Sequence, residues 1–163
     1  MKTTLYVLLG LLALLLLAGR AGLFAGTRPS DLGVSDGRLK APSLTRNSVS
    51  SQADRHPGHP QRDFARVTPL PLIGGDADRS WATLRTALTT LPEITIVRED
   101  DAYLHGEART RWLRFVDDVE FSLDRRRGVI DVRSASRLGR EDFGVNRERV
   151  ERIRAAYLAA GQS

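Results

Sequence analysis

Three consecutive segments in the second half of the chain alternate between apolar and polar residues, and this alternation is the strongest constraint on the fold. The segments are residues 102–113, 118–123 and 129–133, and residues 124–128 supply a turn between the last two. A period of two places successive side chains on opposite faces of a strand. Three such segments in a row, each with one apolar face, predict a twisted antiparallel meander.

Helical patterns flank these segments. One helix is predicted between Asp78, which can cap its start, and Pro92, which ends it. Its apolar stripe is Trp81, Leu84, Leu88 and Leu91. Residues 94–97 predict a short strand. A last helix follows Asn146 as its cap, with an apolar face of Val150, Ile153, Tyr157 and Leu158. The order predicts an α+β fold: a four-stranded antiparallel meander sheet with a helix before and a helix after it, both packed on one face.

The predicted core joins the apolar faces of these helices and strands, so it lies between the sheet and the two helices. Its members are Trp81, Leu84, Leu88, Ile96, Leu104, Phe121, Ile130, Val132, Val150 and Ile153. Residues 76–163 are therefore expected to form the α+β domain.

Residues 1–26 are of a different kind. No charged residue occurs between Lys2 and Arg20, whereas the helix of a soluble core would show polar positions every few residues. The run is about as long as the apolar region of a signal peptide, and extended to Phe24 it reaches the ~20 residues that span a bilayer. We expect an uncleaved single-pass anchor in the inner membrane, with the domain in the periplasm. The alternative is a cleaved signal and a soluble periplasmic protein.

Residues 27–75 are rich in Pro, Gly, Ser, Asp and Arg and show little periodicity. A segment this long without regular structure is usually a linker or a strap laid over a domain. We call it the strap and expect it to be irregular. The residues that could dock it on the domain are Leu39, Val49, Phe64, Val67, Leu70 and Leu72.

Composition narrows the function. The chain has no cysteine, so disulfides, thiolate metal sites and a cysteine nucleophile are excluded. Without Lys2 and Arg20, 23 basic residues face 20 acidic ones. They are scattered rather than gathered on one face, so no nucleic-acid partner is expected. His56 and His59 are three apart, but Pro57 and Gly58 between them forbid a helix, so no metal site is expected. No cofactor is expected either.

Several sequence landmarks follow one another in order. They are residues 32–39, 47–52, 103–109, 115–121, 132–137 and 144–150. In these landmarks the chain resembles a bacterial family catalogued as domain of unknown function 1499 (DUF1499), over about residues 31–158. The family has no established activity, so the resemblance implies a compact, envelope-associated domain without a mechanism. Many relatives carry two cysteines in the first landmarks. Here Ser48 stands at the second, and the first falls at or beside Pro42.

One face of the predicted sheet is polar. By alternation it carries Tyr103, His105, Glu107, Arg109 and Arg111 from one segment, and acidic and basic residues from the next two. Cross-strand neighbours lie ~5 Å apart, so arginines and carboxylates can alternate across it. The candidate ligand-binding residues on or beside this face are His105, Arg109, Asp118, Glu120, Arg133 and Arg137.

Three hypotheses about this face stay open. It is a solvated lattice of exposed ion pairs, or the strap covers it and makes a polar groove, or it serves catalysis. In the groove, Arg109, Arg133 and Arg137 would hold an anionic small molecule, a lipid headgroup or a segment of an envelope protein through forked hydrogen bonds. The function we expect is a membrane-anchored, non-enzymatic binding or interaction domain. The alternative is an envelope hydrolase or isomerase that uses His105 with a carboxylate. No catalytic residue can be assigned.

Overall fold

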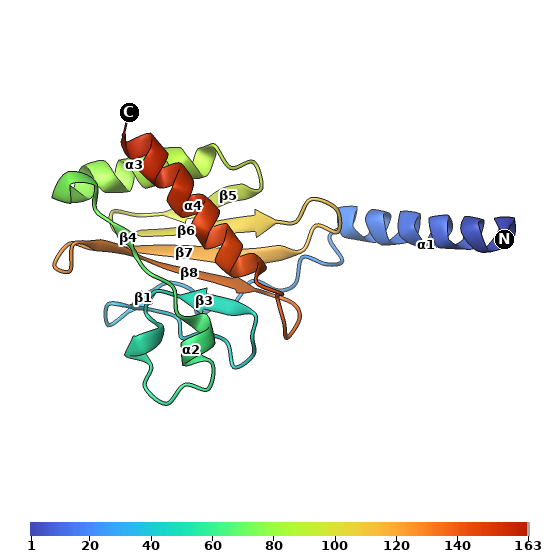
Figure 1. Cartoon of the computed structure of the whole chain (residues 1–163), viewed down its shortest axis with the longest axis horizontal. Helices are drawn as coiled ribbons and strands as arrows, with labels where there is room; N and C mark the ends of the chain where they lie inside the picture. The colour runs from blue at the N-terminus through green and yellow to red at the C-terminus, as the bar shows by residue number, and fades with distance from the viewer. Residues whose placement is uncertain (163) are drawn as a thin grey trace.

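The computed structural model describes residues 1–162 and has an α+β fold (Figure 1). Its main sheet has six antiparallel strands. They are β3 (Ser48–Ser50), β4 (Leu70–Pro71), β5 (Ile94–Glu99), β6 (Tyr103–Arg109), β7 (Val116–Asp124) and β8 (Val129–Ser136). The order across the sheet is β3-β8-β7-β6-β5, and β4 also pairs with β8. A separate two-stranded hairpin consists of β1 (Val34–Ser35) and β2 (Arg38–Leu39).

The helices are α1 (Lys2–Arg20), α2 (Arg62–Ala65), α3 (Ala77–Thr89) and α4 (Val145–Gly161), with short 3-10 turns at Ala53–Arg55 and Ile73–Gly75. Both α3 and α4 pack on one face of the sheet, and α1 projects away from one end of the domain (Figure 1). The predicted α+β class and the antiparallel meander are confirmed, because β5, β6, β7 and β8 pair in sequence order.

The predicted strand count of four is wrong, since the sheet has six strands. The two additional strands come from the strap and lie along the outer edge of β8, with Val49 opposite Ser134 and Leu70 opposite Ile130. They are three and two residues long, too short to show an alternation. The strap therefore contributes strands β1 to β4 in addition to irregular backbone.

Two predicted helix caps need correction. Asp76, not Asp78, caps α3, because its carboxylate accepts a hydrogen bond from the backbone N–H of Arg79 at 2.9 Å. The helix α4 already includes Asn146, and the residue before its first turn is Gly144 with φ +88°. A positive φ is easily adopted by glycine. Asn146 is thereby free for the buried hydrogen bonds described below.

The core lies where it was predicted, between the sheet and helices α3 and α4. Eight of the predicted residues are buried there, and Trp81 and Ile96 pack against them from partly buried positions. Of the expected docking residues of the strap, four are buried: Leu39, Val49, Val67 and Leu70. Phe64 and Leu72 are half-buried. Burial of this apolar surface holds both helices and the later part of the strap on the sheet.

Candidate functional site

Strand register assembles the polar face of the sheet from β6, β7 and β8. His105 lies opposite Glu120, which lies opposite Arg133 on the next strand. One step along, Glu107 lies opposite Asp118. Opposed side chains on one face of an antiparallel pair are ~5 Å apart at Cβ. Three neighbouring strands thus bring four ionisable groups and an arginine into contact.

The first part of the strap covers this face. The guanidinium of Arg28 donates to Glu107 Oε1, with Nη2 at 2.6 Å. The backbone N–H of Gly33 donates to Glu120 Oε1 at 2.9 Å. As a result the ionisable groups of the face are removed from water: His105, Glu107, Asp118, Glu120, Asp131 and Arg133 are each at most 6% exposed.

The strap is also fixed over β8, because its own buried Gln52 binds both the β1–β2 hairpin and Asp131 of β8. Gln52 Oε1 accepts from the backbone N–H of Leu39 at 2.8 Å, and Gln52 Nε2 donates to Asp131 Oδ2 at 2.7 Å. The other partners of Asp131 are the hydroxyl of Ser51 at 2.8 Å and Arg127 Nη1 at 2.6 Å. The strap therefore binds one carboxylate on each of the three strands: Glu107 on β6, Glu120 on β7 and Asp131 on β8.

Glu120 is fully buried at the centre of this arrangement. It accepts from the Tyr103 hydroxyl at 2.9 Å and from Arg133 Nη1 at 2.9 Å, in addition to Gly33. Burial, and then the negative charge of Glu120, raise the pKa of Tyr103 well above its usual value, so this phenol stays protonated and donates. Among residues 1–162, Arg133 Nε finds no hydrogen-bond partner.

Asp118 and Glu107 share Arg137. Arg137 donates to both oxygens of Asp118, from Nε at 2.9 Å and from Nη2 at 2.6 Å, and its Nη2 also reaches Glu107 Oε1 at 2.7 Å. His105 Nε2 lies 2.8 Å from Asp118 Oδ1. At the edge of the face, Arg109 donates to Glu107 Oε2 at 2.7 Å. Arg137 is thus a bridge between two carboxylates that would otherwise repel each other.

The pKa values of the two carboxylates reflect this bridge. Burial alone would raise the pKa of Asp118, but hydrogen bonds from Arg137 and His105 and the charge of Arg137 lower it to about 2. Burial would also raise the pKa of Glu107, but hydrogen bonds from Arg28 and Arg137 outweigh this effect and lower the pKa to about 2. Both groups are therefore ionised at neutral pH and bind Arg137 as anions, and Glu107 also binds Arg28 of the strap.

The structure brings five of the six candidate residues into this buried network, namely His105, Asp118, Glu120, Arg133 and Arg137. Arg109 lies at its rim, with its side chain 37% exposed. The hypothesis of a solvated, exposed lattice is wrong for this face, because the strap covers it. The predicted cover is present, but each of the three arginines already binds a carboxylate. A ligand on these arginines would have to displace protein groups.

His105 has the carboxylate partner that acid–base catalysis would need, at hydrogen-bond distance. It is only 4% exposed, however, and none of the three cavities described for residues 1–162 has it in its wall. A catalytic group must reach the reacting atoms. His105 and Asp118 therefore lie at the distance of an acid–base pair, but His105 is buried away from any substrate in this structure.

A second buried network lies on the helix side of the sheet, and sequence reasoning missed it. Arg149 Nη2 on α4 donates to Asp117 Oδ2 at 2.6 Å. Its Nη1 donates to Ser134 at 3.0 Å, and Asn146 Nδ2 reaches the carbonyl oxygen of Asn47 at 3.0 Å. All five residues are buried. They belong to the landmarks of the family resemblance, which was the one signal that could have identified them.

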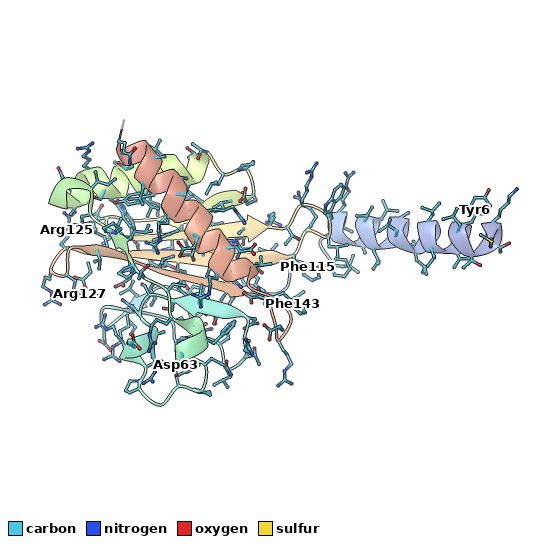
Figure 2. The ribbon with its side chains drawn as sticks, viewed as in Figure 1. Tyr6, Asp63, Phe115, Arg125, Arg127 and Phe143 are labelled. Carbon is cyan, nitrogen blue, oxygen red and sulfur yellow. The ribbon has the colours of Figure 1, made fainter. Side chains whose placement is uncertain are left out.

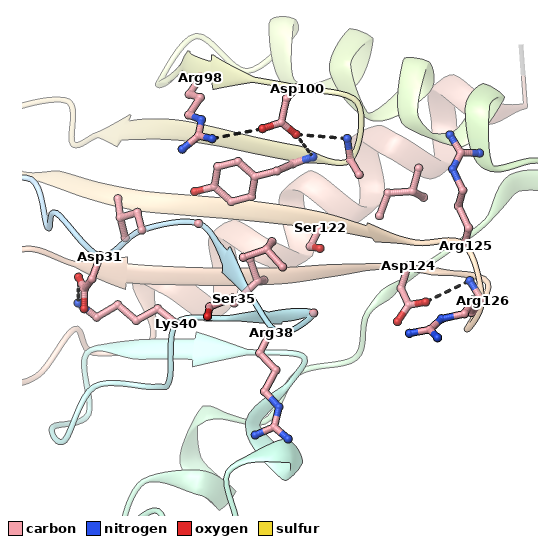
Figure 3. Close-up of a pocket in the computed structure, with 18 of the residues that line it drawn as sticks. Asp31, Ser35, Arg38, Lys40, Arg98, Asp100, Ser122, Asp124, Arg125 and Arg126 are labelled. Carbon is pink, nitrogen blue, oxygen red and sulfur yellow. Dashed lines mark hydrogen bonds and ion pairs between the residues drawn. The ribbon is translucent and has the colours of Figure 1, made fainter.

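A hollow on the strap side lies at the end of the domain away from α1, and we call it the distal cavity (Figure 3). Its volume is about 960 Å³. Tyr103 and Ser122 from the sheet line it, together with the β1–β2 hairpin and the segments at residues 98–102 and 124–126. The sequence did not predict it, because the hairpin and these turns are remote in the chain.

Five basic side chains line the distal cavity, against three acidic ones. Lys40 pairs with Asp31 at 2.5 Å and Arg98 with Asp100 at 3.4 Å; Arg125 pairs with Asp78 outside the cavity at 2.6 Å. The remaining two, Arg38 and Arg126, make no ion pair within residues 1–162. Apolar surface comes from Leu32, Val34 and Leu123. The distal cavity thus combines unpaired guanidinium groups with apolar wall.

The two histidines of the strap do not meet acidic residues in a cluster. His56 lines the distal cavity, and its pKa is lowered, by burial first and then by the charge of Arg38. His59 Nδ1 accepts a hydrogen bond from the backbone N–H of Gln61 at 3.2 Å. In the part of the chain that the structure describes, no group of three or more His, Cys, Asp or Glu residues is arranged to hold a metal ion.

Comparison with known proteins gives one match. A family model described as "Protein of unknown function (DUF1499)" matches residues 29–157. It confirms the resemblance seen in the landmarks. No curated protein and no solved structure matches this chain.

Proposed function

The chain belongs to the DUF1499 family of proteins of unknown function, and we propose that it is a membrane-anchored, non-enzymatic binding domain of the cell envelope. In this proposal α1 is retained in the inner membrane and the domain lies in the periplasm. The ligand is an anionic small molecule with an apolar part, and it occupies the distal cavity. The observation that carries the proposal is that two arginines in an open hollow with apolar walls, Arg38 and Arg126, bind no carboxylate within residues 1–162.

The anchor is supported by how α1 ends. Among residues 1–162, α1 alone is long and apolar enough to cross a membrane, with a mean hydropathy of 1.9. Its last turn packs on the domain: a Cβ added at Gly19 would lie 2.5 Å from the carbonyl oxygen of Leu113. Just beyond, the rings of Phe24 and Phe115 stack at 5.2 Å. Cleavage near Gly19 would discard the contact between α1 and Leu113, so this contact favours an anchor over a cleaved signal.

We expect the protein extracted from membranes to carry α1. Its intact mass should therefore equal that of the whole chain, 18.0 kDa, apart from changes at the initiator methionine. A mass lower by the residues of α1, with the protein recovered in the soluble periplasmic fraction, would contradict the anchor and favour the cleaved form. The measurement is intact-mass spectrometry of both fractions.

The distal cavity replaces the polar sheet face as our proposed ligand site. On the sheet face, Arg133 and Arg137 are only 3% and 5% exposed at their side chains and already hold Glu120, Asp118 and Glu107. In the distal cavity, by contrast, an incoming anion meets arginines without a carboxylate to displace. Charge-assisted hydrogen bonds from a guanidinium fork are about twice as strong as those between neutral groups.

The ligand is expected to copurify with the full-length protein. Untargeted mass spectrometry of small molecules should find an anion that is at least about tenfold depleted in the double variant Arg38→Gln/Arg126→Gln, a loss that corresponds to about 1.4 kcal/mol of binding. The control is Arg62→Gln/Arg85→Gln, which removes two charges from exposed arginines that already pair with carboxylates. Equal amounts of every anion in the three proteins would count against the distal cavity.

A further inference from the structure

A separate cavity lies beside the membrane anchor, and we call it the α1 recess. It has a volume of about 970 Å³ and lies between the last two turns of α1 and the loop that joins β6 to β7. The helix contributes Ala13, Leu16 and Leu17 to its wall, and Arg20 at its end. The loop contributes Arg111, Trp112 and Arg114.

The charge of the α1 recess is all of one sign. Three arginines line it and no acidic residue does. Within residues 1–162 none of Arg20, Arg111 and Arg114 has a carboxylate within ion-pair distance, in contrast to the arginines of the sheet face. The Arg111 guanidinium lies 5.0 Å from the centroid of the Trp112 ring. Trp112 itself is 66% exposed. The three guanidinium groups attract an anion, because no carboxylate in the lining of the recess neutralises their charge.

The length of α1 places this recess at the surface of a bilayer. Its 19 residues rise ~1.5 Å each, or about 28 Å in all, which matches a hydrocarbon core of ~30 Å. Lys2 and Arg20 at its two ends then reach the two headgroup regions. Because the loop packs against Gly19, Trp112 lies at the level where tryptophan is enriched in membrane proteins.

Backbone contacts fix the position of the β6–β7 loop relative to α1. The close approach of Gly19 to Leu113 brings the helix and the loop together at one point, which only a residue without a Cβ allows. The next residue, Arg114, has φ +59° and a side chain that lines the recess. The backbone positions of the two loop arginines, Arg111 and Arg114, relative to α1 are therefore set by the fold.

We propose that the α1 recess binds one anionic phospholipid. The guanidinium groups of Arg20, Arg111 and Arg114 bind its phosphate, and an acyl chain lies along Leu16 and Leu17. This inference rests on the proposed retention of α1 in the membrane. It gives the domain a second contact with the bilayer, which limits its rotation about the anchor.

The test uses Trp112 as the reporter. The chain has two tryptophans, so the full-length Trp81→Phe variant has Trp112 alone. It is reconstituted into vesicles of phosphatidylcholine with a minor fraction of phosphatidylglycerol. In one preparation the phosphatidylglycerol is brominated, and in the other an equal amount of phosphatidylcholine is brominated instead, so the surface charge is the same. We expect brominated phosphatidylglycerol to quench Trp112 about twofold more, because basic residues enrich anionic lipid around them.

The excess quenching should disappear in the variant Arg111→Gln/Arg114→Gln. The matched control, Arg62→Gln/Arg85→Gln, removes two charges from exposed arginines that line neither the α1 recess nor the distal cavity, and it should keep the excess quenching. Equal quenching by the two brominated lipids, in protein that floats with the vesicles, would overturn the lipid site and leave the anchor intact. Protein that does not float with the vesicles would overturn the anchor, and the lipid site with it.

Discussion

The variant Asp118→Asn should lose about 3 kcal/mol or more of unfolding free energy at neutral pH. Breaking a buried ion pair by removing one partner costs roughly 3–5 kcal/mol, because the other charge stays buried. Here the partner left behind is Arg137, whose side chain is 5% exposed. We place the loss at the lower end of the range because Arg137 keeps Glu107. The measurement is denaturant unfolding of the full chain in detergent micelles.

The control is Asp63→Asn, the same chemical change in an ion pair at the surface. The Asp63 side chain is 75% exposed where it pairs with Arg62 and Arg66, and exposed pairs contribute about 0–1 kcal/mol. If both variants lost equally little, the buried network would not be a source of stability.

The loss in Asp118→Asn should also depend on pH. The pKa of Asp118 is about 2 in the folded protein, below the ordinary value of 3.8. A carboxyl with a lowered pKa adds stability above its unfolded pKa and loses that contribution as the pH falls through the folded value. The gap between wild type and Asp118→Asn should therefore narrow as the pH falls from about 3.8 towards 2. A constant gap would assign the loss to packing instead.

Phe121→Ala should cost about 3–5 kcal/mol, the range for truncating a buried phenylalanine. Phe121 has no exposed surface and lies in the core between the sheet and the two helices. The unfolding of the full chain can be followed by near-ultraviolet circular dichroism, which reports packing of the aromatic side chains.

Phe143→Ala is the matched control, since Phe143 is 90% exposed at a loop (Figure 2). Exposed substitutions usually change stability by no more than about 0.5 kcal/mol. A small effect at Phe121 would mean that β7 presents its other face to the core, because a shift of one residue exchanges the faces of a strand.

The meander was predictable because its information is local. In β7, Val119 and Phe121 alternate with Asp118 and Glu120, so the sequence alone identifies the core face and the polar face. The same holds for the apolar stripes of α3 and α4. The pairing of neighbouring strands follows from short connections in chain order.

The strap strands, the cover of the polar face and the two cavities depend on contacts between residues far apart in the chain. β3 is a strand because Val49 meets Ser134 on β8, not because Ser48–Ser50 favours one. Alternation placed His105, Asp118, Glu120 and Arg133 on a common face, but it could not say what covers that face. The cover depends on contacts such as that between Gly33 and Glu120, 87 residues apart. The distal cavity and the α1 recess arise in the same way, from loops that the sequence keeps apart.

The path of the strap has a mechanical consequence. It begins just after α1 and meets β6 at Glu107, then β7 at Glu120, and then β8 at Asp131, where Gln52 of the strap binds. A tensile force applied between α1 and the domain would therefore load these contacts one after another rather than together. Once the contacts of Gly19 with Leu113 and of Phe24 with Phe115 are lost, the first of the strap contacts to carry the load is the pair Arg28–Glu107, where the Arg28 side chain is 51% exposed. Under tension the strap would peel from the sheet in that order, and the apolar core would carry load only when the peeling reached β3, whose Val49 is buried in it.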